Sequence, residues 1–194
     1  MTVYATDNWW NAVSSGDRVR LATTDPSGVT PSSTTMSSGR ATMSVTLRTV
    51  GSQTITATDR DDSNITPMTT TGINVLPSAA TRFLIDNIPS PQTAGVAVSV
   101  RIRAVDAGGN TVPSFASDAV LYANTGLGSI SPELITFANG EWQGSMIFRG
   151  AGANVSFVCS DFATTPHTGT SNQFQVQPGT FTKMQILLPG ETVH

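Results

Sequence analysis

The feature that most constrains the fold is an internal repeat. Shifted by 101 residues, the segment 79–93 (AATRFLIDNIPSPQT) falls on the segment 180–194 (TFTKMQILLPGETVH), and each follows a proline, Pro77 or Pro178. Both segments read as the opening strand of a domain, but only the first is followed by a whole domain. A period near 101 in 194 residues predicts two domains, each large enough to bury its own core.

Composition limits the classes of function. Charged residues make up 12% of the chain and the net charge is −3, so no basic surface for nucleic acid is expected. No run of 18 apolar residues is present, and we expect no membrane insertion. The single cysteine, Cys159, cannot form a disulfide within the chain, and we expect no cofactor.

Apolar residues recur with a period of two, which predicts strands with one buried face. Val98, Val100 and Ile102 alternate with polar or small residues, and a shorter run of the same kind lies at Val3 and Ala5. Both runs lead into matching turns, ATDNWWN at 5–11 and AVDAGGN at 104–110. Asp, Asn and Gly in these turns favour tight backbone geometry.

The later segments supply further short strands between turns, which predicts an all-β chain of two tandem immunoglobulin-like β-sandwiches plus a C-terminal strand. We assign residues 1–76 to a sandwich without its first strand, 77–79 to a linker, 80–177 to a complete sandwich and 178–194 to an orphan opening strand. The expected inward positions of the first sandwich are Val3, Ala5, Val45, Leu47, Ile55, Ile73 and Val75.

The motifs resemble those of a known class of domain. The A-x-D-x-x-x-N turn, a glycine turn before an S-V-T-L strand, and GSQTITATD at 51–59 together resemble bacterial immunoglobulin-like tandem repeats of large surface and secreted proteins. The second domain departs from the pattern with NVSFVCSD at 154–161. The resemblance implies an extracellular or cell-surface bacterial location and a structural or adhesive role, and it supplies no catalytic residue.

Candidate catalytic and metal sites have simpler structural interpretations. The histidines are His167 and His194, and neither forms a recognisable motif with a carboxylate and a nucleophile, so we predict that the chain is not an enzyme. Cys159 is expected in the core. Calcium could bind aspartates that end strands at one pole of each sandwich, although Asp also suits such turns. The candidates are Asp106 and Asp161, with Asp7, Asp59, Asp61 and Asp62 in the first domain.

The adjacent pair Trp9 and Trp10 forms the only aromatic cluster outside the strands, where the second domain has Gly108 and Gly109. Exposed indoles suit wet interfaces, so the pair could contact a neighbouring subunit or a glycan. Alternatively, one ring caps the end of the core. A subunit contact or a core cap is favoured over glycan binding, because one loop without other convergent polar groups is weak evidence for a ligand pocket.

The two ends of the repeat pattern complement each other. A sandwich without its first strand exposes a free sheet edge, while Met184, Ile186 and Leu188 alternate as a strand with no domain to bury them. The hypothesis is donor-strand complementation between copies, with 180–194 as the donor and 1–76 as the acceptor of a fibre. Alternatively, the chain is a segment of a longer array of adjoining repeats. The competing function is an adhesive or glycan-binding repeat.

Overall fold

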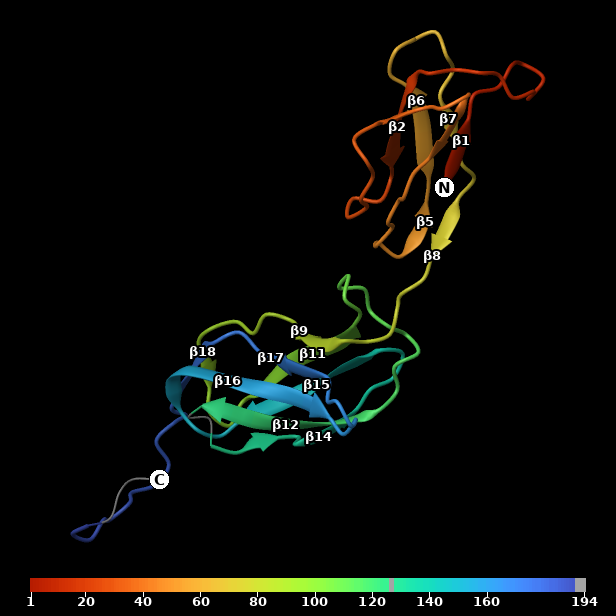
Figure 1. Cartoon of the computed structure of the whole chain (residues 1–194). Helices are drawn as coiled ribbons and strands as arrows, with labels where there is room; N and C mark the ends of the chain where they lie inside the picture. Colours follow the sequence, from red (N-terminus) through yellow and green to blue (C-terminus); the bar gives the residue numbers. More distant parts are fainter. Residues whose placement is uncertain (126–127, 191–194) are drawn as a thin grey trace. The chain divides into compact units, whose positions relative to one another are not determined.

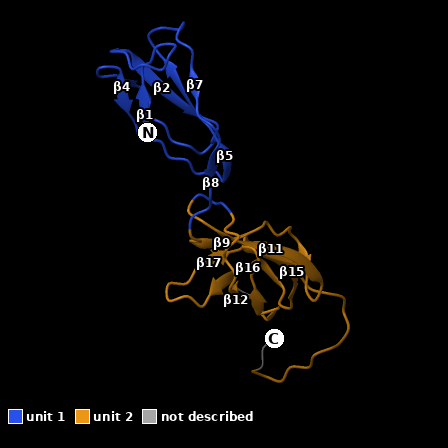
Figure 2. Ribbon diagram, turned by 90° about the vertical axis from the view of Figure 1, so that its right-hand side faces the viewer, with its two compact units in different colours: residues 1–78, 108–110 blue, residues 79–107, 111–194 orange. Residues whose placement is uncertain are grey.

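The computed structural model describes residues 1–125 and 128–190, and every regular element in those ranges is a β-strand (Figure 1). The chain divides into two compact units (Figure 2). Unit 1 comprises residues 1–78 with 108–110, and unit 2 comprises residues 79–107 with 111–194. No helix capable of crossing a membrane occurs among the described residues.

Unit 2 is a sandwich of two mainly antiparallel sheets. The first sheet has the order β13-β15-β11-β9, and the second has the order β10-β18-β16-β12-β14, with β17 also paired to β16. The strands of the first sheet are β9 (Arg82–Ile85), β11 (Ala97–Val105), β13 (Ile130–Ser131) and β15 (Glu141–Phe148). Those of the second are β10 (Gln92–Thr93), β12 (Asp118–Thr125), β14 (Leu134–Thr136), β16 (Gly152–Asp161), β17 (Thr168–Thr170) and β18 (Phe174–Gln177).

The core of unit 2 lies between these sheets and follows the period-two pattern. Along β11, Val98, Val100 and Ile102 are buried while the intervening side chains are exposed. The opposite sheet contributes Phe157 and Phe174, whose rings pack near that of Phe148 with centroids 6.1 and 5.0 Å away. Alternation along the strands therefore places one continuous apolar layer between the sheets.

Unit 1 has the same layout in shorter strands. One layer is the pair β1 (Thr2–Tyr4) and β4 (Arg40–Thr42). The other layer holds the sheet β3-β2-β6-β7 and the pair β5-β8. Their bounds are β2 (Arg18–Thr23), β3 (Thr34–Thr35), β5 (Gly51–Gln53), β6 (Ile55–Asp59), β7 (Met68–Thr69) and β8 (Ile73–Val75). The prediction of an all-β, immunoglobulin-like chain is confirmed.

One predicted strand of unit 1 is largely missing. Val45 and Leu47 are half-buried as inward positions, but β4 ends at Thr42 and only an isolated bridge joins Thr46 to Val29. In unit 2 the matching strand β15 runs to Phe148 because the nine-residue β11 pairs with it along its length. The ladder between β1 and this segment ends at Met43, which exchanges hydrogen bonds with Met1, so the described residues 44–47 do not form a continuous strand.

A glycine at the same turn of each unit allows two backbone segments to approach closely. Gly39 and Gly140 have φ of +73° and +77°. A Cβ on Gly140 would lie 2.3 Å from the carbonyl oxygen of Val112, and a Cβ on Gly39 would meet that of Val13. The turn therefore requires glycine for both its positive φ and its contact.

Replacing this glycine tests the requirement. We expect Gly140→Ala to destabilise unit 2 by about 2 kcal/mol or more, because positive φ and a backbone clash add together. Gly95→Ala is the matched control, since Gly95 has φ +82° but nothing within 4 Å of an added Cβ. Chemical denaturation would measure both variants. Equal losses would contradict the role of the close approach.

The C-terminal segment leads away from the sandwich of unit 2 without regular structure (Figure 1). Residues 178–190 form no strand, and the predicted part of the donor strand at 191–194 lies outside the described residues. Met184 and Ile186 are 86% and 89% exposed. A strand forms only where its backbone groups find a neighbouring strand, and this segment has none among the described residues.

Candidate functional site

The candidate site is the free edge of β1. Its position in the sandwich is fixed by two hydrogen bonds that each unit makes at the same place. Ala5 N donates to Gly39 O at 2.8 Å, and Ala104 N donates to Gly140 O at 2.8 Å. Val13 N and Val112 N then donate to the carbonyls of those alanines. This equivalence matches Ala5 to Ala104 and Val3 to Ile102, so β1 corresponds to the second half of β11.

In unit 2 this edge is covered. β9 pairs antiparallel with β11, placing Ile85 opposite Ile102 and Phe83 opposite Ala104. Ile102 and Ala104 are both 0% exposed. The backbone ladder continues past the strand, where Thr81 N donates to Val105 O at 2.8 Å. The opening strand therefore both completes the sheet and seals the core beneath it.

In unit 1 the same edge is open. Among the described residues, β1 pairs with β4 alone. Val3 and Ala5 are half-buried and Met1 is 45% exposed, although their counterparts in unit 2 are buried. Of the other predicted inward residues, Ile55 is buried. The remaining four are only half-buried, although the residues aligned with them in unit 2 are buried. These aligned residues are Val45 with Met146, Leu47 with Phe148, Ile73 with Phe174 and Val75 with Val176.

The C-terminal segment has the apolar pattern of the strand β9. By the 101-residue shift, Met184 takes the place of Phe83 and Ile186 takes that of Ile85. Leu188 stands before Pro189 as the buried Ile88 stands before Pro89. Met184, Ile186 and Leu188 are 86%, 89% and 66% exposed, and none of them lies in a strand.

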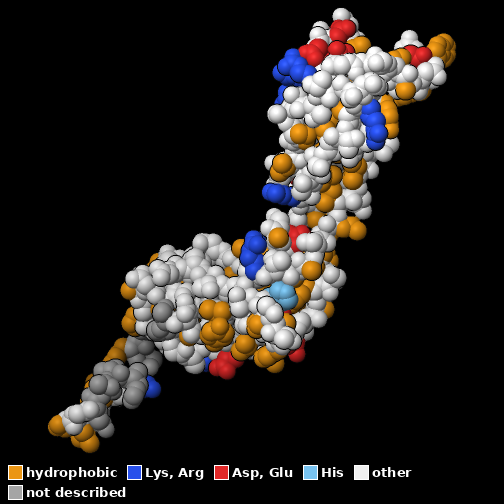
Figure 3. Space-filling view, in the orientation of Figure 1, with side chains coloured by type: hydrophobic (Ala, Val, Ile, Leu, Met, Phe, Trp, Pro, Cys, Tyr) orange, Lys and Arg blue, Asp and Glu red, His pale blue; other side chains and the backbone are white. Residues whose placement is uncertain are grey.

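The loop after β1 displays the tryptophan pair. Trp9 and Trp10 are 82% and 72% exposed, so neither indole caps the core. Figure 3 shows hydrophobic side chains at the tip of this loop and along the C-terminal segment. Asp7 holds the loop, since its carboxylate accepts hydrogen bonds from Trp9 N, Asn11 N and the Asn11 side chain. These bonds lower the pKa of Asp7, and the bond from the Asn11 side chain has the largest effect.

Trp10 occupies a strained backbone position. Its φ is +66°, where Gly109 in the equivalent loop has +86°. Because L-residues other than glycine disfavour this region, Trp10→Gly should stabilise unit 1 by about 1 kcal/mol. Trp9, whose φ is not positive, provides the control: Trp9→Gly should leave stability unchanged or lower it. Thermal unfolding of both variants measures the difference, and a destabilised Trp10→Gly would contradict the strain.

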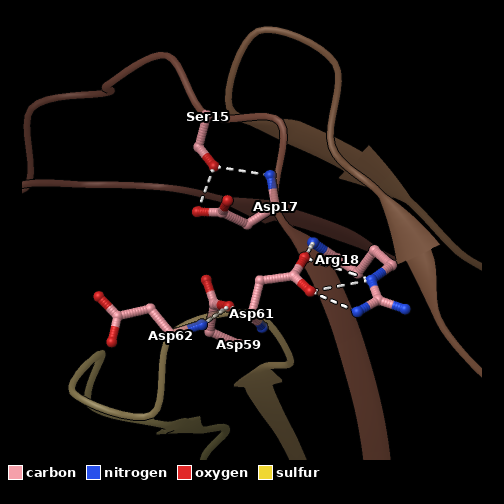
Figure 4. Close-up of polar contacts among 6 residues, drawn as sticks. All are labelled: Ser15, Asp17, Arg18, Asp59, Asp61 and Asp62. Atoms are coloured by element: carbon pink, nitrogen blue, oxygen red, sulfur yellow. Dashed lines mark hydrogen bonds and ion pairs between the residues drawn. The ribbon is translucent and has the colours of Figure 1, made fainter.

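The calcium candidates are engaged with nearby groups. Asp61 forms an ion pair with Arg18, Asp59 accepts hydrogen bonds from the backbone of residues 61 and 62, and the Asp62 carboxylate points away from both (Figure 4). Asp106 is buried, and the Asp161 carboxylate bonds to His167. The described residues contain no group of three acidic, His or Cys side chains that could hold a metal ion.

A histidine–carboxylate pair was missed by the sequence analysis. His167 Nδ1 lies 2.6 Å from Asp161 Oδ2, and His167 N donates to the same carboxylate. Burial opposes ionisation of Asp161, but these hydrogen bonds outweigh it and lower its pKa. The signal was the six-residue spacing across the β16–β17 hairpin. Cys159 provides no nucleophile there, because it is fully buried and burial raises the pKa of its thiol to about 12.

A second buried carboxylate, Asp25, also escaped the sequence analysis. Its oxygens accept hydrogen bonds from the Thr49 hydroxyl and from the backbone of residues 27, 48 and 49. Burial raises the pKa of Asp25, but the hydrogen bonds outweigh burial and bring the pKa well below the usual range. The hydrogen bond from the Thr49 hydroxyl lowers the pKa most. Asp25 therefore joins two loops of unit 1, which is a structural role.

No family model matches the sequence, and no curated protein matches it either. Several solved structures are similar to the chain at low identity. The D00-D0 domain of intimin is 15% identical with a TM-score of 0.45, covering 91% of this chain and 92% of that chain. Domains 4 and 5 of the S-layer protein SbsC are 14% identical with a TM-score of 0.34, covering 89% and 78%.

Two further similar structures are larger proteins. The Escherichia coli adhesin FdeC is 19% identical with a TM-score of 0.38, covering 91% of this chain and 58% of that one. The β-glucuronidase of Parabacteroides merdae is 14% identical with a TM-score of 0.38, and the match spans 80% of this chain and only 21% of the enzyme. At these values the likeness concerns β-sheet architecture alone.

Proposed function

We propose that the protein is a structural component of a bacterial surface fibre or rod, in which the segment 180–188 of one copy completes the sheet at β1 of the next. The bacterial, extracellular setting rests on the resemblance of its turns and of GSQTITATD to tandem surface repeats. The observation that carries the linkage is the contrast between β11, which β9 seals, and β1, which is open.

The pairing of β9 with β11 defines the expected register. Ile186 corresponds to Ile85 and Val3 corresponds to Ile102, so the register of unit 2 puts Ile186 opposite Val3. By the same transfer Met184 lies opposite Ala5. Both tail side chains then point inward, as Ile85 and Phe83 do in unit 2. Gln185 points outward, as Leu84 does.

The contact would bury apolar side chains and satisfy backbone groups that are exposed in the separate chains. Burying an apolar side chain of this size contributes about 1.5–3 kcal/mol, and Met184, Ile186 and Leu188 would all leave solvent. Backbone hydrogen bonds along an open edge add affinity, as in other cases of strand addition. Because donor and acceptor are different surfaces, the contact is heterologous and extends into a filament unless its rotation closes a ring.

Electron microscopy and intact mass together test the proposal. Purified protein should form filaments whose depolymerised subunit has a mass near 20 kDa. A much larger covalent mass with repeats in series would show instead that the strand beside β1 comes from an adjoining repeat. Protein that stays monomeric at high concentration, with β1 amides exchanging freely with solvent, would contradict strand completion.

A second candidate function is adhesion through glycan binding. The specific observation in its favour is the high exposure of Trp9 and Trp10 on a loop braced by Asp7. Indole faces stack on sugar rings, but the loop presents no set of convergent polar groups. A glycan array probed with the wild-type chain and with Trp9→Ala tests this function, and loss of binding in the variant would support it.

A further inference from the structure

We infer that the loop 7–11, with Trp9 and Trp10, is a docking surface for residues 181–183 of a second copy, directly beside the place where its donor strand pairs. This inference rests on the proposed strand exchange and names a second contact within it.

Unit 2 shows which part of the acceptor lies at the start of the opening strand. Thr81 N donates to Val105 O, and Arg82 Nη1 lies 3.4 Å from the carbonyl oxygen of Asp106. Asp106 is the first residue of the turn that matches Asp7 in unit 1. The chain that leads into the opening strand therefore runs beside the start of this turn.

The same register places the tail beside the tryptophan loop. Thr182 takes the position of Thr81, and Lys183 takes that of Arg82 next to the Asp7 carbonyl. Phe181, which is 76% exposed, takes the position of Ala80, which packs against the core of unit 2. A phenyl ring and the only lysine of the chain would thus arrive beside two exposed indoles.

The size of the side chains in the turn changes together with the size of those in the opening segment. Where the turn carries Gly108 and Gly109, the opening segment begins with alanines at 79 and 80. Where the turn carries Trp9 and Trp10, the opening segment carries Phe181. Aromatic rings pair favourably with one another, and an ammonium group is attracted to an indole face. Large side chains in the turn thus go with a large side chain in the opening segment, and small ones go with small ones.

Strain at Trp10 is a second observation in favour of an interaction. The turn folds with glycine at this position in unit 2, so folding does not require an indole on a backbone with φ +66°. Strained, exposed residues of this kind cluster at functional sites.

The experiment uses the 194-residue chain carrying Trp142→Phe and Ile186→Asp. The first change leaves Trp9 and Trp10 as the only tryptophans, which can be excited selectively over the two tyrosines, and the second disables the chain's own tail as a competitor. The probe is a synthetic peptide of residues 178–190, which contains no tryptophan. Calorimetry measures its binding, and fluorescence measures the environment of the indoles.

We expect the peptide to bind and to shift the indole emission to shorter wavelength. A peptide carrying Phe181→Ala should bind more weakly and produce a smaller shift. In the acceptor, Trp9→Gly together with Trp10→Gly reproduces the turn of unit 2, and it should weaken peptide binding about 10-fold through lost aromatic contacts.

The failures can be distinguished. Peptide binding with unchanged emission and unchanged affinity in the double glycine variant would overturn the docking loop but leave strand completion intact. No peptide binding at all would overturn strand completion and the docking loop together. A shift produced by cellohexaose but not by the peptide would identify the loop as a glycan platform and overturn the inference.

Discussion

A chain carrying Ile186→Asp should bind the next copy roughly 100-fold more weakly than wild type. In the proposed register Ile186 lies opposite Val3, in the position that the buried Ile85 holds in unit 2. The substitution removes about 1.5–3 kcal/mol of apolar burial and would bury an unpaired carboxylate beneath the edge of β1, and each 1.4 kcal/mol weakens binding tenfold. Sedimentation velocity across a concentration series measures the loss.

Gln185→Asp is the matched control, because it introduces the same charge one residue away. Its counterpart Leu84 is 37% exposed and points out of the sheet, so this variant should associate like wild type. If Gln185→Asp disrupts association as strongly as Ile186→Asp, net charge explains the effect and the alternation of the donor strand is wrong.

Phe148→Ala should destabilise unit 2 by about 3–5 kcal/mol, whereas Leu47→Ala at the aligned position of unit 1 should cost about 1 kcal/mol. Phe148 is 0% exposed and packs near Phe157 and Phe174, so its removal leaves a closed cavity. Leu47 is half-buried, and solvent already reaches its site. Hydrogen exchange followed by mass spectrometry resolves the opening free energies of the two units in one chain.

The comparison needs a check that the variants act locally. Phe148→Ala should leave exchange in β2 and β6 of unit 1 unchanged, and Leu47→Ala should leave β11 and β16 unchanged. Equal costs at the two positions would mean that unit 1 is as tightly closed as unit 2, which would remove the physical basis of the open edge.

The fold class was predictable because the signals were local. Period-two alternation, as in Val98, Val100 and Ile102, specifies strands with one buried face, and the 101-residue repeat divides them into two sets. The extent of each strand was harder to predict. Val45 and Leu47 alternate correctly, yet the segment that holds them forms only the isolated bridge between Thr46 and Val29, since strand length depends on the partner ladder and not on the segment alone.

The candidate site was predictable in pattern but not in environment. The spacing of Met184 and Ile186 identified a strand that needs a partner, because the same spacing is followed by a full domain at Phe83 and Ile85. The exposure of Trp9 and Trp10 could not be predicted, since a sequence does not say which way a loop projects. The side chains of Asp161 and His167 meet because the hairpin between β16 and β17 brings them together, and their residue types alone do not predict this contact.

One pairing in unit 2 has a mechanical consequence. β10, in the opening segment, runs parallel to β18, the final strand, with Gln92 opposite Val176. Tension applied to the two ends of the domain would slide these neighbours along each other and strain their hydrogen bonds simultaneously, as in a lap joint. A domain whose terminal strands pair in parallel resists stretching better than one whose terminal strands separate one hydrogen bond after another.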